Sequence, residues 1–164
     1  MIAYTTMNSP LGVVLLAGAD RDDRTGTVLL SVSFTGTVDA AWHRDDAAFA
    51  DVTRQLAEYF AGERTEFDLD RMTRGTPFQR RVWAAVDAVP YGCTASYGEI
   101  ARRIGAPRDR IRAVGAAVGA NPLLIVRPCH RVVGADGALT GYAGGVSRKR
   151  DLLTLEGALQ PTLI

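Results

Sequence analysis

Cysteine is scarce in this sequence, and long apolar runs are missing. The 164 residues include 2 cysteines, Cys93 and Cys129, and a single distant pair does not make the disulfide framework of a small secreted protein. No apolar signal segment opens the chain. Its longest apolar stretches fall far short of the roughly 20 residues that a membrane-spanning helix needs. We therefore expect a soluble cytoplasmic protein with no membrane association.

Metal-ligand patterns are also missing. The two cysteines do not have the C-x-x-C spacing of a zinc site, and the two histidines, His43 and His130, lie in different halves of the chain. We therefore expect no metal centre.

Acidic residues are few in the second half of the chain, and basic residues are few in the first. Residues 1–70 hold 5 basic and 12 acidic side chains, whereas residues 71–164 hold 14 basic and 6 acidic ones. The net charges of the two parts are therefore −7 and +8. Such a basic half suits an anionic partner such as nucleic acid, although a solvated basic face explains the charge equally well.

The first part of the chain predicts a small sheet with a helix, over residues 1–72. Residues 2–20 read as a hairpin that turns at residues 9–12, and a polar loop follows at residues 20–26. A half-buried strand is predicted next, with one face made of Val28, Leu30, Val32 and Phe34. A helix is predicted over about residues 46–61.

The second part, residues 73–157, is predicted to be mainly helical, and residues 158–164 form a tail. Thr76 and Gln79 make a capping box at the start of a helix that ends at Pro90. We therefore predict an α/β (α+β) protein in which a small N-terminal sheet-plus-helix lobe packs on a mainly helical C-terminal lobe.

A helix-turn-helix is predicted within residues 96–119. Ser96 and Glu99 form a second capping box, and the second helix begins at about Arg108. Small residues dominate this helix, so it offers few polar side chains to base edges in a major groove. Small residues permit close approach, either to a minor groove or to the protein core. From this stretch alone, the core interpretation is favoured.

The stretch PCHRVVG contains the clearest candidate for chemistry. Cys129 could attack as a thiolate, His130 could take its proton, and Glu156 could fix the histidine tautomer. Neighbours in an extended segment point to opposite sides, so this pair needs a sharp turn or a bridging water. Taken alone, Cys129 is better explained as an inert core thiol.

The helix predicted to begin at Ser147 has its charges at the wrong ends. Its first turn carries three basic residues, 148–150, and Glu156 lies in its last turn. Both placements oppose the helix dipole. They predict that the basic turn meets an external anion and that Glu156 has a cationic or hydrogen-bonding partner.

Five motifs, taken together, resemble the O6-alkylguanine-DNA alkyltransferase family over residues 75–157. They are SYGEIARRIGAP, RAVGAAVGANP, PCHRVVG, GYAGG and LLTLEG. The resemblance implies DNA repair by direct reversal. An alkyl group would pass irreversibly from O6-alkylguanine in duplex DNA to Cys129, after the damaged nucleotide has flipped out. O4-alkylthymine is a second candidate lesion. The implied enzyme is a single-turnover methyltransferase that needs no cofactor, is a monomer in solution and could bind DNA cooperatively.

The resemblance also implies roles for individual residues. The catalytic residues would be the acceptor Cys129, its activator His130 acting through a water, the orienting Glu156, and Tyr97 as proton donor to the leaving base. The DNA contacts would be Arg112 as an inserted finger, Ala113, Gly115, Ala117 and Asn121, which also ties the helix to the cysteine turn. The substrate pocket would be formed by Val132, Tyr142, Ala143 and Gly144.

The sequence departs from the family pattern at two places. Ala143 follows Tyr142 where family members often have serine, so a pocket hydroxyl is missing. The turn in APRDRIRAVG is about one residue longer than the commoner pattern, which shifts Arg112 relative to Tyr97.

Three other functions use part of the same pattern. A non-catalytic protein that binds alkylated DNA would lack the nucleophile, and a Cys-His-Glu hydrolase would turn over ester or amide substrates repeatedly. A regulator activated by its own methylation would carry a further cysteine-rich module, for which 164 residues leave no room. We therefore favour the stand-alone repair enzyme.

Overall fold

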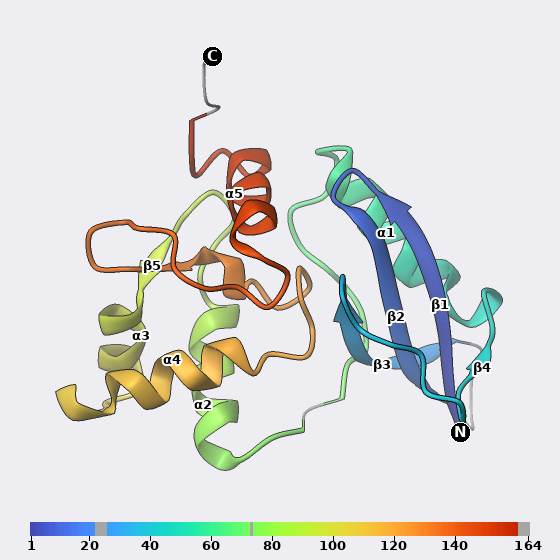
Figure 1. Cartoon of the computed structure of the whole chain (residues 1–164), viewed down its shortest axis with the longest axis horizontal. Coiled ribbons are helices and arrows are strands. Elements are labelled where there is room, and N and C mark those ends of the chain that lie inside the picture. Colours follow the sequence, from blue (N-terminus) through green and yellow to red (C-terminus); the bar gives the residue numbers. More distant parts are fainter. Residues whose placement is uncertain (22–25, 73, 161–164) are drawn as a thin grey trace. The chain divides into compact units, whose positions relative to one another are not determined.

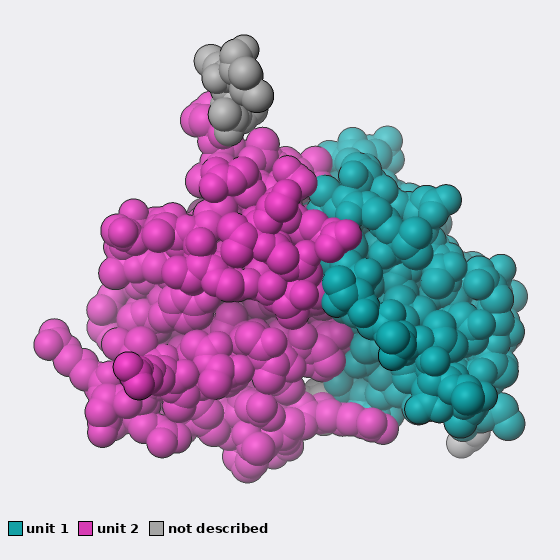
Figure 2. Space-filling model, viewed as in Figure 1, with its two compact units in different colours: residues 1–72 teal, residues 73–164 magenta. Residues whose placement is uncertain are grey.

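The chain forms two compact units, residues 1–72 and residues 73–164 (Figures 1 and 2). The computed structural model describes residues 1–21, 26–72 and 74–160. Most of the loop predicted at residues 20–26 and the end of the predicted tail lie outside this part. The α/β class is confirmed, because the first unit holds a sheet and a helix while the second is mainly helical.

The first unit is built on a four-stranded sheet of order β3-β2-β1-β4. Strands β1 (Ile2–Ser9) and β2 (Gly12–Asp20) form the predicted antiparallel hairpin. Strand β3 (Thr27–Ser33) is antiparallel to β2, and the short β4 (His43–Arg44) is parallel to β1. Gly12 has a φ of 114°, which favours glycine where the hairpin turns.

The predicted inward face of β3 is wrong in its first half. The structure buries Leu29, whereas its neighbours Val28 and Leu30 are only half-buried. The register with β2 shifts between Ala17 and Gly18, where Leu30 is the extra residue of a bulge. A bulge reverses the alternation of side chains partway along a strand, so Leu29 and Val32 share the buried side.

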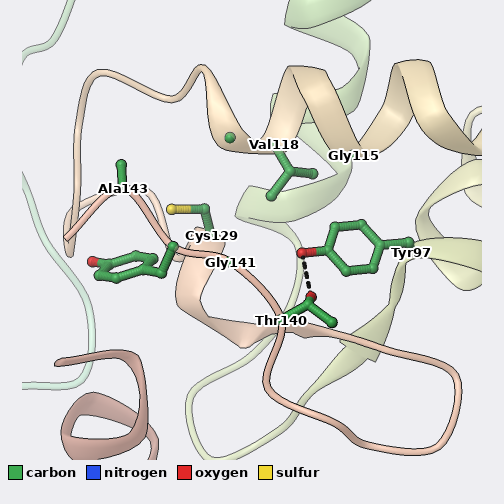
Figure 3. A pocket seen from close by; sticks show the side chains of 9 residues that line it. Tyr97, Gly115, Val118, Cys129, Thr140, Gly141 and Ala143 are labelled. Carbon is green, nitrogen blue, oxygen red and sulfur yellow. Dashed lines mark hydrogen bonds between the residues drawn. The ribbon is translucent and has the colours of Figure 1, made fainter. Parts of the chain in front are cut away.

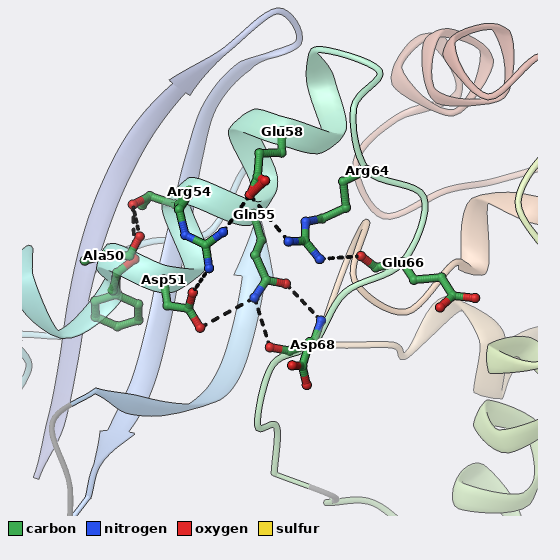
Figure 4. Close-up of polar contacts among 10 residues, drawn as sticks. Ala50, Asp51, Arg54, Gln55, Glu58, Arg64, Glu66 and Asp68 are labelled. Atoms are coloured by element: carbon green, nitrogen blue, oxygen red, sulfur yellow. Dashed lines mark hydrogen bonds and ion pairs between the residues drawn. The ribbon is translucent and has the colours of Figure 1, made fainter.

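Helix α1 (Ala50–Phe60) follows a 3-10 turn and packs against the sheet, as predicted. Gln55 is buried in this helix and its amide hydrogen-bonds in both directions to the backbone of Asp68, each bond at 2.9 Å (Figure 4). Arg54 pairs on the exposed side with Glu58 at 2.8 Å and with Asp51. Exposed pairs contribute little, so the buried amide is the stronger tie between α1 and the segment that follows it.

The second unit contains four α-helices within its described residues: α2 (Pro77–Asp87), α3 (Tyr97–Arg103), α4 (Ile111–Gly119) and α5 (Val146–Leu155). Helices α2 and α3 both pack against α4. A short parallel pair, β5 (Ala95–Ser96) and β6 (Val132–Val133), joins the start of α3 to the segment after Cys129.

The predicted caps are confirmed in full for α2 and in half for α3. The N–H of Gln79 donates to Thr76 Oγ1 at 3.1 Å, and the N–H of Thr76 donates to Gln79 Oε1 at 3.0 Å. The Ser96 hydroxyl accepts from the Glu99 N–H at 3.1 Å, which is the first bond of a capping box. The Glu99 carboxylate accepts from the Ser96 hydroxyl and not from the Ser96 N–H, so the second bond of the box is replaced by a contact between side chains.

Helix α4 begins three residues later than predicted, after a 3-10 turn at Arg108–Arg110. Its inner face is buried and consists of Val114, Ala117 and Val118. The outer face keeps small residues that are exposed or half-buried, among them Ala113, Gly115, Ala116 and Gly119. Packing in the protein core therefore explains the small residues on one face of α4, and the other face is accessible to a ligand. No helix in the described ranges is long and apolar enough to cross a membrane.

Candidate active site

Two tight turns bring Cys129 into position. The N–H of Val126 donates to the carbonyl two residues earlier at 2.8 Å, across Ile125 with a φ of 71°. A positive φ is a strained conformation for a β-branched residue. The N–H of Cys129 likewise donates to the Arg127 carbonyl at 2.7 Å, across Pro128 with φ −80° and ψ 56°. The chain therefore bends sharply twice before the cysteine.

Cys129 and His130 lie in a 3-10 turn, Cys129–Arg131, and all three residues of this turn are buried. Successive side chains in a 3-10 helix are about 120° apart, because the helix has about 3 residues per turn. The sequence called for a sharp turn or a bridging water, and the turn is present.

Asn121 links the end of α4 to the cysteine turn, as the sequence predicted. Its amide nitrogen lies 3.1 Å from Cys129 Sγ and also donates to the carbonyls of Leu123 and Arg127. Its oxygen accepts from the Leu123 N–H at 3.0 Å. Asn121 is only 5% exposed, so we assign it this positioning role in place of the predicted DNA contact.

Glu156, at the C-terminal cap of α5, has the cationic and hydrogen-bonding partners that its unfavourable position predicted. Its Oε2 lies 2.8 Å from His130 Nε2, and Arg131 donates to both carboxylate oxygens, at 2.7 and 3.0 Å. All three side chains are buried. With Nε2 assigned as the donor to Glu156, His130 Nδ1 is an acceptor. Nδ1 is buried and has no hydrogen-bond partner among the described protein groups.

Burial dominates the protonation of this pair. It raises the pKa of the Cys129 thiol, although the hydrogen bond from Asn121 and the charge of Lys149 act in the opposite direction. It lowers the pKa of His130, against the opposing effect of Glu156. The imidazole is therefore neutral near pH 7 and able to accept a proton.

Lys149 is a site residue that sequence reasoning missed. The sequence predicted that the basic turn at residues 148–150 faces an external anion. Lys149 instead points inward, is 1% exposed, and donates from Nζ to the carbonyls of Thr140 and Gly141 at 3.2 and 3.5 Å. Burial lowers the pKa of its ammonium group, and the nearby Cys129 opposes this. Three consecutive basic residues gave no signal that the middle one is internal.

A pocket of about 400 Å³ opens beside the cysteine, and Figure 3 shows side chains that line it. The lining residues are Tyr97, Gly115, Val118, Gly119, Cys129, Thr140, Gly141, Tyr142 and Ala143. Tyr97, Cys129, Tyr142 and Ala143 therefore meet at one site, as the sequence predicted.

Two predicted pocket residues do not line this cavity. Val132 is fully buried in β6, where it pairs with Ala95. Gly144 is also buried, and its carbonyl accepts from Arg148 at 3.0 Å. Both lie close in sequence to lining residues, but Val132 is engaged in strand pairing and the Gly144 carbonyl in a bond to the first turns of α5.

The predicted DNA contacts of α4 divide between its two faces. Arg112 is exposed, and Ala113 and Gly115 are half-buried. Ala117 belongs to the interior instead, because it is 3% exposed and its carbonyl accepts from Trp83 Nε1 at 2.8 Å. The prediction that Ala117 contacts DNA is therefore corrected.

The described residues contain no cluster of three or more histidine, cysteine or acidic side chains that could hold a metal ion. Cys129 is buried and Cys93 is exposed, and both are free thiols. A buried thiol and a tyrosine hydroxyl therefore line one pocket, and the residue next to the thiol is a neutral histidine oriented by a carboxylate. This set is suited to nucleophilic attack by sulfur on a small electrophile.

Comparison with known proteins gives matches in both units. The family described as "6-O-methylguanine DNA methyltransferase, DNA binding domain" matches residues 77–158. The family described as "6-O-methylguanine DNA methyltransferase, ribonuclease-like domain" matches residues 2–70.

Curated relatives match over nearly the full length of the chain. The methylated-DNA–protein-cysteine methyltransferase of Mycolicibacterium paratuberculosis is 51% identical over 164 residues, which cover 98% of this chain and 96% of the relative. The constitutive methylated-DNA–protein-cysteine methyltransferase of Bacillus subtilis is 44% identical over 158 residues, which cover 93% of this chain and 94% of the relative.

Solved structures agree with these sequence matches. Mycobacterium tuberculosis OGT in complex with DNA has 51% identity and a TM-score of 0.86, with coverage of 95% of this chain and 93% of that chain. Mycobacterium tuberculosis O6-methylguanine methyltransferase has 50% identity and a TM-score of 0.85, with coverage of 98% and 96%. The resemblance found in the sequence is thereby confirmed: the chain belongs to the 6-O-methylguanine DNA methyltransferase family.

Proposed function

We propose that this protein repairs DNA by direct reversal, moving the alkyl group of O6-alkylguanine in duplex DNA to its own Cys129. The observation that carries the proposal is that Cys129 and Tyr97 line one pocket, while His130, the residue after the cysteine, is hydrogen-bonded to Glu156. The curated relatives are methylated-DNA–protein-cysteine methyltransferases, and the OGT of Mycobacterium tuberculosis forms a complex with DNA. We assign the same activity and the same partner to this chain.

The proposed reaction begins with extrusion of the damaged nucleotide. A thiol that is 5% exposed in a pocket of about 400 Å³ cannot reach a base inside a stacked duplex. Such a volume lies within the range of ordinary small-molecule sites, about 300–1,000 Å³. The base therefore enters the pocket and presents its O6-alkyl carbon to the sulfur.

Cys129 then acts as the nucleophile. Its proton passes through a water to His130 Nδ1, and the sulfur attacks the alkyl carbon in line. The carbon–oxygen bond breaks, its electrons stay on the base, and Tyr97 donates a proton to guanine N3. The buried Nδ1, which has no hydrogen-bond partner in the part of the chain that the structure describes, supports this relay, as does the neutral state that burial gives the imidazole. The thioether is not hydrolysed, so each molecule acts once.

The outer face of α4 would contact the minor groove in this proposal. Its small residues allow close approach, and Arg112 is exposed at the start of the helix, where it would fill the gap left by the flipped nucleotide. Arg110 is engaged elsewhere, because its guanidinium lies over the Phe78 ring at 5.0 Å. We place the reaction in the cytoplasm, where a free Cys129 thiol stays reduced.

Intact-protein mass spectrometry tests the proposal. After incubation with a duplex that contains O6-methylguanine, we expect the wild-type protein to gain one methyl group, located on the Cys129 peptide. Cys129→Ser should gain none, while Cys93→Ser, which changes the exposed cysteine, should behave as wild type. Binding of the duplex without any methyl gain would support a non-catalytic lesion binder. Repeated turnover of an ester probe would support the hydrolase.

A further inference from the structure

A hydrogen bond joins two hydroxyl groups in the lining of the pocket that are distant in sequence. Thr140 Oγ1 donates to the Tyr97 hydroxyl at 3.0 Å, as Figure 3 shows. Both residues line the cavity that holds Cys129. Across residues 1–21, 26–72 and 74–160, no other group hydrogen-bonds to the Tyr97 hydroxyl. Thr140 was not among the site residues that the sequence predicted.

Both partners are held by the fold. Tyr97 is the first residue of α3, directly after the Ser96 cap and the β5–β6 pairing. Thr140 is held through its carbonyl, which accepts from the buried ammonium group of Lys149 at 3.2 Å. The contact between the two hydroxyls is therefore set by two anchored backbones.

The direction of this bond decides what Tyr97 can do. A tyrosine hydroxyl has one proton to donate and also accepts hydrogen bonds. When Thr140 donates to the oxygen, the tyrosine proton is free to point at a base in the pocket. As that proton leaves, negative charge grows on the oxygen, and the Thr140 donor becomes a stronger, charge-assisted partner.

We propose that Thr140 is a positioning residue that directs the Tyr97 proton toward the leaving base and stabilises the phenolate oxygen as the proton departs. This role rests on the proposed alkyl transfer and deepens it. Thr140 acts on the substrate only through Tyr97, so its effect disappears when Tyr97 has no hydroxyl.

A double-mutant cycle tests this coupling. Thr140→Val removes the hydroxyl and keeps the side-chain shape, and Thr140→Ser keeps a hydroxyl. Each is made in the wild-type protein and in Tyr97→Phe, and the second-order rate of methyl transfer from an O6-methylguanine duplex is measured. We expect Thr140→Val to slow transfer by about three- to tenfold, the value of one hydrogen bond. Thr140→Ser should restore most of the rate.

The Tyr97→Phe background separates coupling from a structural effect. There, Thr140→Val should cause no further loss. Thr140 is exposed, so these variants should fold, and equal melting temperatures would verify this. Equal duplex affinities would show that the rate change is not a binding change. Should Thr140→Val prove unstable, Thr140→Ala takes its place in the cycle.

Two results would overturn the role of Thr140. A rate that is unchanged or faster in Thr140→Val would mean that the hydroxyl does not assist Tyr97 or that it holds the proton back. An equal loss in the Tyr97→Phe background would mean that Thr140 acts through the loop alone. Failure of the proposed function is distinct, because the wild-type protein itself would then gain no methyl group.

Discussion

Arg131 and Glu156 form a two-point ion pair in the interior of the second unit. Arg131 Nε donates to Oε1 at 2.7 Å and Nη2 donates to Oε2 at 3.0 Å, while His130 shares Oε2 at 2.8 Å. Arg131 also donates to the Val89 carbonyl at 2.7 Å. The carboxylate that orients the histidine is therefore itself held in place and neutralised by the next residue in the chain.

Arg131→Met should destabilise the protein strongly. It removes the guanidinium that pairs with the buried Glu156 carboxylate, and breaking a buried ion pair by removing one side typically costs about 3–5 kcal/mol. Urea unfolding followed by circular dichroism measures the loss. The double variant Arg131→Met/Glu156→Gln is the control, because it removes the uncompensated charge and should recover part of the stability. Equal stability of the single and double variants would contradict the assigned pair.

His130 should make stability depend on pH in a defined direction. Burial lowers its pKa in the folded protein, whereas an unfolded histidine titrates near 6.5. Below about pH 6.5 the unfolded chain therefore binds more protons at this residue than the folded one. The contribution of His130 to the free energy of unfolding is therefore fully present above about pH 6.5. It decreases as the pH falls, by up to about 1.4 kcal/mol per pH unit.

Urea unfolding at pH 7 and pH 5 measures this loss. His130→Gln should lose less stability between the two values than the wild type. The same pH difference in His130→Gln and wild type would show that His130 does not titrate as its burial requires.

Lys149→Met should shift the pH dependence of Cys129 reactivity to higher pH. The charge of Lys149 opposes the burial that raises the pKa of the thiol, so its removal raises this pKa further. Methyl transfer at neutral pH should slow by about three- to tenfold, the range expected for a shift of up to about one pKa unit. The rate of methyl transfer measured between pH 6 and pH 9 tests this.

Arg150→Met is the matched control for Lys149. It removes a cation from the same turn of α5, but Arg150 is exposed and outside the pocket lining. Its pH profile should match that of the wild type. If both variants show the same alkaline shift, a general loss of positive charge is responsible, and the specific role of the buried lysine is wrong.

Features encoded by local sequence could be predicted, and the capping box of Thr76 and Gln79 shows why. The two residues lie three apart and complete each other's backbone hydrogen bonds, so the start of α2 is visible without tertiary context. The resemblance to the alkyltransferase family likewise implied that Tyr97, Cys129 and Tyr142 form one site, and all three line the same pocket.

Features that depend on contacts between distant segments could not be predicted. The bulge at Leu30 arises from the register with β2, and the positive φ of Ile125 belongs to a turn that no glycine marks. Lys149 lies in a basic turn that resembles a solvent-exposed surface, and its bonds to the distant Thr140 and Gly141 carbonyls are what hold it inside. Thr140 itself belongs to no pattern, because its partner Tyr97 is 43 residues away.

Arg112→Ala should separate DNA contact from chemistry. Arg112 is exposed at the start of α4 and does not line the pocket, so the variant keeps Cys129, His130 and Tyr97 in place. As an inserted side chain it would stabilise only the flipped state of a duplex. We therefore expect transfer from an O6-methylguanine duplex to fall by about tenfold or more, the effect of losing roughly 1.4 kcal/mol, while transfer from the free alkylated base stays near wild type.

Paired rate measurements on the two substrates settle this role of Arg112. Arg102→Ala is a control for the loss of one exposed cation from the neighbouring α3, and it should change the duplex rate less than Arg112→Ala does. An equal loss on the duplex and on the free base would mean that Arg112 supports the pocket and does not enter the DNA. In that case the longer turn before α4 would place a residue other than Arg112 in the gap left by the flipped nucleotide. Ile111 is exposed and next to Arg112 in the same turn, so it would be the first residue to test by substitution.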